Sequence, residues 1–133
     1  MWPFMYTWQM IRAARKDSNH NEIANYFLNH GASVGDLSQV KRLCDLVVGF
    51  RGINELVEVK DGSKPPSQQK LTPGEQQFHD RHRGSISVIT NLEQAKQLLL
   101  AMDQKSIALI SAGINLMRAK WNQKQEDHRE SLQ

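Results

Sequence analysis

The sequence predicts an α/β fold, in which a four-stranded mixed sheet is flanked by helices and a long helix ends the chain. Three observations support this prediction. Short runs rich in Val, Ile, Leu and Phe alternate with segments of helical periodicity. Two of these runs are separated only by Arg51-Gly52, which is typical of a β-hairpin. The second strand of this hairpin, a helix, a further strand and a further helix come in succession, and this order indicates a crossover with at least one parallel strand pair.

The composition is that of one globular domain. The chain has 133 residues, 39% of them hydrophobic and 23% charged, which is enough for one core but not for two. The formal net charge of +3 suits a polyanionic partner without requiring one. The single cysteine excludes an internal disulfide, and no apolar run reaches the roughly 18 residues of a membrane span. We therefore expect a cytoplasmic protein that has no membrane partner.

We divide the chain into three parts. Residues 1–16 form an arm in which two tryptophans and other aromatic residues precede a basic cluster. Such an arm stacks on nucleic acid in some proteins, and in others it packs on the domain or on a second subunit. Residues 17–104 form the core, and residues 105–133 form an amphipathic helix with a frayed tail.

The first helix and strand are predicted within residues 19–37. Asn19 and Glu22 have the spacing of a capping box, an apolar stripe follows, and Gly31 ends the helix. Residues 32–37 are then a plausible first strand. The polar loop 38–42 leads from this strand to the hairpin.

The hairpin spans residues 44–60, CDLVVGFRGINELVEVK, and it determines where the charged residues lie. Side chains alternate along a strand, so Glu58 and Lys60 share one face of the second strand. If the hairpin closes near Gly52, the start of the first strand lies beside the end of the second. Asp45 then lies next to Glu58.

Two neighbouring carboxylates attract a hard cation such as Mg²⁺ or Mn²⁺. The carbonyl of Val59 is a further candidate ligand, because it lies between Glu58 and Lys60 in the chain. Lys60 would orient the attacking water or neutralise charge on a phosphate. The alternative is an ordinary Lys-Glu pair at the edge of a sheet, and a Glu-x-Lys triplet alone does not distinguish the two.

An Asp that opens one strand and a Glu-x-Lys that closes the next resemble the PD-(D/E)xK nuclease superfamily. This superfamily includes Holliday-junction resolvases, restriction enzymes and small VRR-NUC-type nucleases. The run EVKDGSKPPSQQKLTPGEQQFHDRHRG also resembles small phage and prophage members, and the likeness covers residues 12–100 approximately. One position departs from the pattern, because Cys44 stands where the family usually has a proline that is not a ligand.

The resemblance implies a restriction-endonuclease-like core and a metal-dependent DNA nuclease, in the host cytoplasm if the gene is a phage gene. It assigns metal binding and catalysis to Asp45, Glu58 and Lys60. Gln76 matches a glutamine that related nucleases carry on the following helix, so it becomes a fourth site residue. Relatives also bring a glutamate from the first helix to the metal, which makes Glu22 either a ligand or only a cap. A non-catalytic DNA-binding or regulatory protein with the same fold is the alternative.

The segment after the hairpin supplies basic residues. Residues 61–70 form a loop, and Thr72-Pro73-Gly74-Glu75 combines a cap, a proline at the first helical position and a glutamate at the third. The helix that follows is expected to reach Arg83, with Gly84 as its stop. Phe78 is its one apolar residue between Glu75 and Arg83, so its polar face meets water or a charged ligand. The candidate DNA contacts are Lys41, Arg42, Lys64, Lys70, Arg81 and Arg83.

The C-terminal third is predicted to hold a short strand, residues 86–90, and two helices. The helix that Asn91 opens has one apolar face, which ends at Met102. A second helix, from Ser106 to about His128, carries apolar residues at steps of three and four. This pattern is typical of a helix that pairs with its own copy in a homodimer, and equally of one that folds back to cover the sheet.

Overall fold

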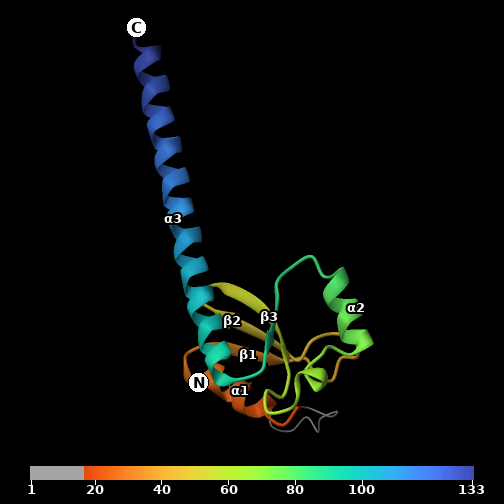
Figure 1. Ribbon diagram of the computed structural model, residues 1–133. Helices are drawn as coiled ribbons and strands as arrows, with labels where there is room; N and C mark the ends of the chain where they lie inside the picture. The colour runs from red at the N-terminus through yellow and green to blue at the C-terminus, as the bar shows by residue number, and fades with distance from the viewer. Residues whose placement is uncertain (1–16) are drawn as a thin grey trace.

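The computed structural model of the protein describes residues 17–133, so the predicted N-terminal arm lies outside the described residues. The fold is α/β with a four-stranded mixed sheet and a long C-terminal helix, as predicted (Figure 1). In chain order the elements are α1 (His20–Asn29), β1 (Ser33–Asp36), β2 (Leu46–Phe50), β3 (Ile53–Val59), the 3₁₀ turn η2 (Pro66–Gln68), α2 (Pro73–Arg81), β4 (Ile86–Ile89) and α3 (Leu92–Ser131).

The sheet has the strand order β1-β2-β3-β4. The first three strands are antiparallel neighbours, whereas β4 runs parallel to β3 after the crossover through α2. Phe50 pairs with Ile53, so the predicted hairpin closes through a two-residue turn. Arg51 and Gly52 both have positive φ, 53° and 79°, as in a type I′ turn, whose twist matches that of the strands.

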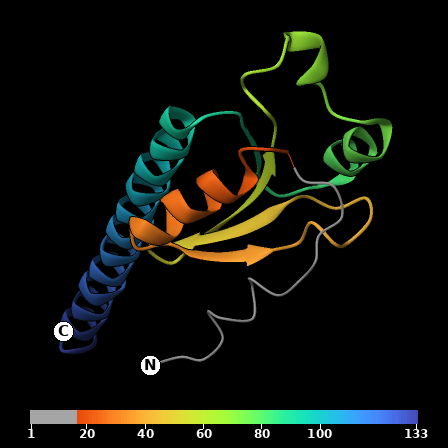
Figure 2. The same cartoon turned by 90° about the horizontal axis from the view of Figure 1, so that it is seen from below.

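Two of the three helices cover the sheet. In Figures 1 and 2, α1 and the first half of α3 lie side by side on one face of the sheet, and α2 stands apart from both. The core lies under α1 and α3 and includes Ile23, Phe27, Leu46, Val48, Val57, Val59, Ala95, Leu99 and Met102. No residue of α2 is buried, as its narrow apolar stripe predicted, and its helix ends at Arg81, two residues before the predicted end.

Asn19 opens α1, but the predicted capping box with Glu22 is wrong. The Asn19 side chain makes no cap hydrogen bond. Its amide Nδ2 instead donates to the carbonyls of Lys60 and Thr90, at 2.9 and 3.0 Å. These two residues directly follow β3 and β4, whose parallel ends present carbonyls that need donors. Asn19 therefore joins α1 to the carboxyl ends of both strands.

The C-terminal region forms one helix and not the two that were predicted. α3 runs for 40 residues without a break at 104/105, and it continues through the predicted frayed tail to Ser131. At the base of its free half, the Ser106 hydroxyl donates to the Arg51 carbonyl at 2.6 Å, and Arg51 Nε lies 3.7 Å from Asp103 Oδ1. These contacts fasten α3 to the turn of the hairpin.

Beyond Ser106 the helix projects away from the sheet (Figure 1). The alternative in which this part folds back over the sheet is therefore wrong.

Within residues 17–133, no helix is both long enough and apolar enough to cross a membrane.

Candidate active site

The hairpin places Asp45 beside Glu58, as its register predicted. Leu46 pairs with Val57, and the Asp45 amide donates to the Val57 carbonyl at 3.1 Å. The Asp45 carboxylate reaches across the strands, where Oδ2 accepts the Val59 amide at 2.7 Å. Asp45 is thus held at the end of β2 by backbone contacts, with its carboxylate directed toward the end of β3.

Lys60 lies between two glutamates. Its Nζ is 3.7 Å from Glu58 Oε1 and 2.6 Å from Glu75 Oε2. Lys60 and Glu58 are almost fully buried, with side-chain exposures of 8% and 4%. Glu75 belongs to the first turn of α2, where the predicted capping box is confirmed: Thr72 Oγ1 accepts the Glu75 amide, and Glu75 Oε2 accepts the Thr72 amide. One glutamate oxygen therefore holds both the helix start and the lysine.

Burial and mutual repulsion dominate the titration of these acids. Burial raises the pKa of Glu58 to about 9, and the charges of Asp45 and Glu75 add to this shift. Burial also raises the pKa of Asp45, against the lowering effect of the Val59 amide. For Lys60, burial lowers the pKa, but the hydrogen bond to Glu75 and the nearby carboxylates outweigh it, so the net shift is upward. Lys60 is therefore charged, while Glu58 holds a proton at neutral pH.

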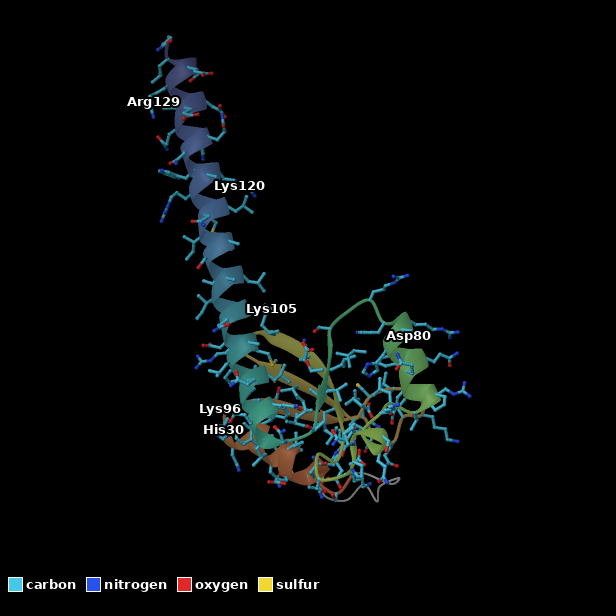
Figure 3. All side chains as sticks on the ribbon, in the orientation of Figure 1. His30, Asp80, Lys96, Lys105, Lys120 and Arg129 are labelled. Carbon is cyan, nitrogen blue, oxygen red and sulfur yellow. The ribbon has the colours of Figure 1, made fainter. Side chains whose placement is uncertain are left out.

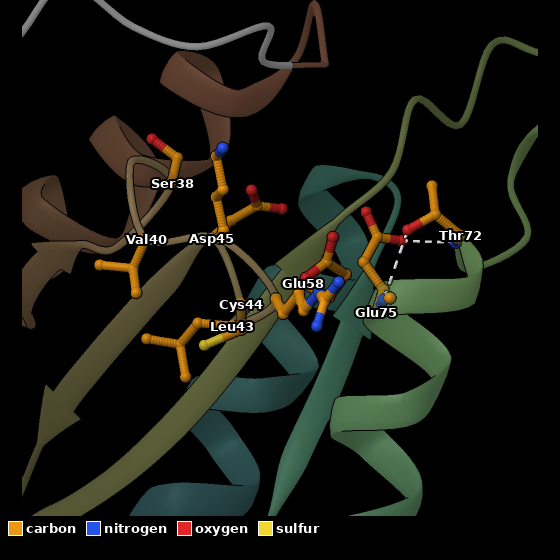
Figure 4. A pocket seen from close by; sticks show the side chains of 11 residues that line it. Ser38, Val40, Leu43, Cys44, Asp45, Glu58, Thr72 and Glu75 are labelled. Atoms are coloured by element: carbon orange, nitrogen blue, oxygen red, sulfur yellow. Dashed lines mark hydrogen bonds between the residues drawn. The ribbon is translucent and has the colours of Figure 1, made fainter.

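A pocket of about 260 Å³ opens over these acids. Figure 4 shows Glu58 between Asp45 and Glu75 in its wall. The lining residues are Ser38, Val40, Lys41, Arg42, Leu43, Cys44, Asp45, Glu58, Thr72, Gly74 and Glu75. The wall thus joins three acids to two basic residues of the loop before β2.

Arg42 adopts a left-handed backbone conformation with φ of 59°. Such a conformation is uncommon for a residue with a side chain, and it concentrates at functional sites. The stem of Arg42 runs close to Gly74 at the start of α2, where an added Cβ would lie 3.6 Å from Arg42 Cγ. The loop before β2 and the start of α2 therefore meet across the pocket.

Two predicted site residues lie elsewhere. Gln76 is exposed on α2, and its amide donates to Asp80 Oδ1 at 2.8 Å; both residues belong to the helix shown with Asp80 labelled in Figure 3. Glu22 is exposed on α1. Neither lines the pocket, and Val59 contributes its amide to Asp45 but is not a lining residue. The helical wheel explains Gln76, since the first turn of α2 turns Glu75, one residue earlier, toward the strands.

The predicted DNA contacts divide into two groups. Lys41 and Arg42 are exposed and line the pocket. The remaining ones, Lys64, Lys70, Arg81 and Arg83, are exposed on the loops and helix beyond β3 and do not line it.

Sequence reasoning assigned Glu75 only to the capping box, and it did not consider His20. His20 is buried at the start of α1, with Nε2 3.5 Å from Asp36 Oδ2. Asp36 in turn accepts the amide and the hydroxyl of Ser38, which lines the pocket. Glu75 lies 15 residues after Lys60 and is fully explained locally as a capping residue, so no local pattern pointed to its bond with Lys60, and none pointed to His20.

The oxygen donors of Asp45 and Glu58 suit a hard divalent cation. A raised carboxyl pKa beside a second acid is the electrostatic condition that a cation relieves. Across residues 17–133, no three or more His, Cys, Asp and Glu side chains gather closely enough to hold a metal ion by themselves. Mg²⁺ commonly takes one or two carboxylates and fills its other positions with water and phosphate oxygens, so the two acids match its requirement.

Comparison of the chain with protein-family models, with curated proteins and with solved structures finds no match.

Proposed function

We propose that the protein is a metal-dependent DNA nuclease, with a restriction-endonuclease-like core of the PD-(D/E)xK type. The observation that carries the proposal is a pair of acids in the wall of one pocket, the half-buried Asp45 and the buried Glu58, together with two basic residues of the same wall. The buried ammonium of Lys60 lies behind them, 3.7 Å from Glu58 Oε1. An ordinary Lys-Glu pair at the edge of a sheet would need neither a second acid nor the burial of both partners. A buried acid whose pKa is strongly raised, as that of Glu58 is, is typical of a functional site, because its instability is tolerated for the chemistry it performs.

Asp45 and Glu58 would hold Mg²⁺ or Mn²⁺. When bound, the ion supplies a Lewis acid that polarises a phosphodiester and lowers the pKa of a coordinated water. The Val59 amide fixes the Asp45 carboxylate, so that this acid is oriented before the ion arrives. Because the mobile proton of Glu58 is lost when a cation binds, metal affinity rises with pH.

Lys60 acts through its positive charge. The hydrogen bond and the charge of Glu75 raise the pKa of Lys60 against the effect of burial and keep it protonated, so it does not accept the proton of the attacking water. It stabilises negative charge on the reacting phosphate. Glu75 is a positioning residue in this scheme, since its carboxylate holds Nζ at 2.6 Å.

The substrate is DNA in this proposal because two basic residues line the pocket of the acids. Lys41 and Arg42 stand at the pocket, where they would grip the phosphates next to the cleaved bond. Further contacts with the DNA backbone would come from residues exposed on the loops after β3 and on α2, which are Lys64, Lys70, Arg81 and Arg83. Contacts of this kind bind the backbone without reading its sequence, and their contribution falls as salt rises.

The experiment is a cleavage assay on labelled single-stranded, duplex, nicked and branched DNA with Mg²⁺, repeated with EDTA. Asp45→Asn and Lys60→Met should each reduce the Mg²⁺-dependent rate by at least about 100-fold, the loss typical when a transition-state contact is removed. Glu55→Gln is the matched control. Glu55 is also buried on β3, but it accepts hydrogen bonds from Ser85 and Ser87 and does not line the pocket.

Cleavage that survives in both site variants would refute the assigned site. Salt-sensitive DNA binding by the wild type without metal-dependent turnover on any substrate would refute the nuclease and support a DNA-binding protein that retains the fold.

A further inference from the structure

The free half of α3 carries an apolar stripe with the spacing of a coiled coil. Ile107, Ile110, Ile114, Met117 and Trp121 follow one another at steps of three, four, three and four. These are successive a and d positions of a heptad, so the five side chains lie along one side of the helix.

The stripe has no cover within residues 17–133. Its members are 50–73% exposed, and Figure 1 shows this half of α3 standing clear of the sheet. Figure 3 shows the helix from Lys120 to Arg129 with no other segment of the described chain beside it. The attachment of α3 to the core does not depend on this stripe, because Ala95, Leu99 and Met102 anchor the first half of the helix there.

The exposed area is close to what a stable pair of helices requires. An Ile or Met side chain carries on the order of 100 Å² of apolar surface and a Trp roughly 200 Å². At the observed exposures the stripe offers roughly 400 Å² per copy. Two copies, together with the stems of flanking side chains such as Arg118 and Lys120, reach the total of about 1,000 Å² expected of a specific interface.

Charge at the ends of the stripe favours one orientation. Asp103, which also faces Arg51 at 3.7 Å, precedes Ile107 by four residues, and Lys124 and His128 follow Trp121 by three and seven, all on the same side of the helix. A parallel pair would set Lys124 against Lys124 and Asp103 against Asp103. An antiparallel pair in which Ile114 packs on Met117 of the second copy instead brings Asp103 near the Lys124 and His128 end.

We propose that the free half of α3 binds a second copy of this chain as an antiparallel two-helix coiled coil. The pairing does not depend on the nuclease proposal. It would place the two α/β bodies at opposite ends of the paired helices, because each body lies at the beginning of its own α3.

The first test is the mass of the full chain in solution by light scattering after gel filtration, from about 5 to 200 μM. The wild type should have twice the 15.2 kDa mass of one chain. Ile114→Asp places a charge in the centre of both faces and should weaken dimerisation at least about 100-fold. Ala119→Asp is the matched control, since Ala119 is exposed on the opposite side of the helix, and it should remain dimeric. Circular dichroism confirms that both variants stay folded.

The second test fixes the orientation. Cysteines placed at Ile110 of one copy and Trp121 of another should form a disulfide in the antiparallel pair, while Ile110→Cys alone should not cross-link to itself. The native Cys44 is buried and does not compete.

A wild type that is monomeric at every concentration overturns the proposal and leaves the stripe to a helix of another protein. A dimer that Ile114→Asp leaves intact, an assembly larger than two, or self-linking of Ile110→Cys without the mixed disulfide, also overturns it.

Discussion

Glu58→Gln should stabilise the fold while it removes the site. Glu58 is 4% exposed in its side chain, and its pKa is raised from 4.5 to about 9 by burial and by the neighbouring acids. The folded protein therefore holds a proton on Glu58 in the pH range where the unfolded chain has lost it. The raised pKa of Glu58 therefore lowers the free energy of unfolding. This loss of stability is absent below about pH 4.5, grows as the pH rises, and levels off above about pH 9.

The magnitude follows from the size of this shift. At pH 7 the interval above the unfolded pKa is about 2.5 units, which corresponds to about 3 kcal/mol of lost stability. Glutamine has the same shape as the protonated acid and carries no charge, so Glu58→Gln avoids this cost. For a chain of this size the gain corresponds to a rise in Tm of roughly 10 °C at pH 7.

The assay is thermal unfolding by circular dichroism at pH 5, 7 and 8.5, without divalent cations. The difference in Tm between Glu58→Gln and the wild type should be small at pH 5 and should widen at each higher pH. Glu55→Gln is the control on the same strand; it weakens two hydrogen bonds from serine hydroxyls and should not stabilise. Mg²⁺ should raise the Tm of the wild type but not that of Glu58→Gln. A Tm difference that stays constant from pH 5 to 8.5 would refute the reasoning.

Three further variants test the framework of the site. Asn19→Ala removes two donated hydrogen bonds to the ends of β3 and β4 and should cost about 2 kcal/mol in urea unfolding; an unchanged midpoint would contradict this role. Gly52→Ala forces a side chain into a positive φ of 79° and should cost about 1 kcal/mol, whereas Gly113→Ala in the exposed middle of α3 should be neutral or stabilising. Glu75→Gln keeps an acceptor for Lys60 but removes the charge, so the pKa of Lys60 should fall and the alkaline limb of the cleavage profile should move to lower pH; a profile that does not move would refute positioning by Glu75.

The sequence was sufficient where local chemistry determines structure. The turn at Arg51-Gly52 and the apolar runs on both sides of it identified the hairpin, and the hairpin register then placed Asp45 beside Glu58. The Thr72 to Glu75 capping box was likewise readable, because its hydrogen bonds join residues three positions apart.

The rest depends on contacts between distant residues. Asn19 has the spacing of a cap, yet its side chain bonds to carbonyls 41 and 71 residues away. Glu75 has a complete local explanation as a capping residue, so nothing in its neighbourhood indicated the bond to Lys60. The length of α3 was not predicted because the polar stretch around Asp103 and Lys105 suggested that a helix ends there. This stretch contains neither the proline nor the glycine that usually ends a helix.

The attachment of α3 to the hairpin turn has a mechanical consequence. The turn at Arg51 lies at one end of β2 and β3, and the acids lie at the other. The two strands are hydrogen-bonded along their whole length, so they tilt together as a stiff plate. A force on the free half of α3 would therefore move Asp45 and Glu58 together, and it would change their position relative to Glu75 on α2 and not the distance between the two acids.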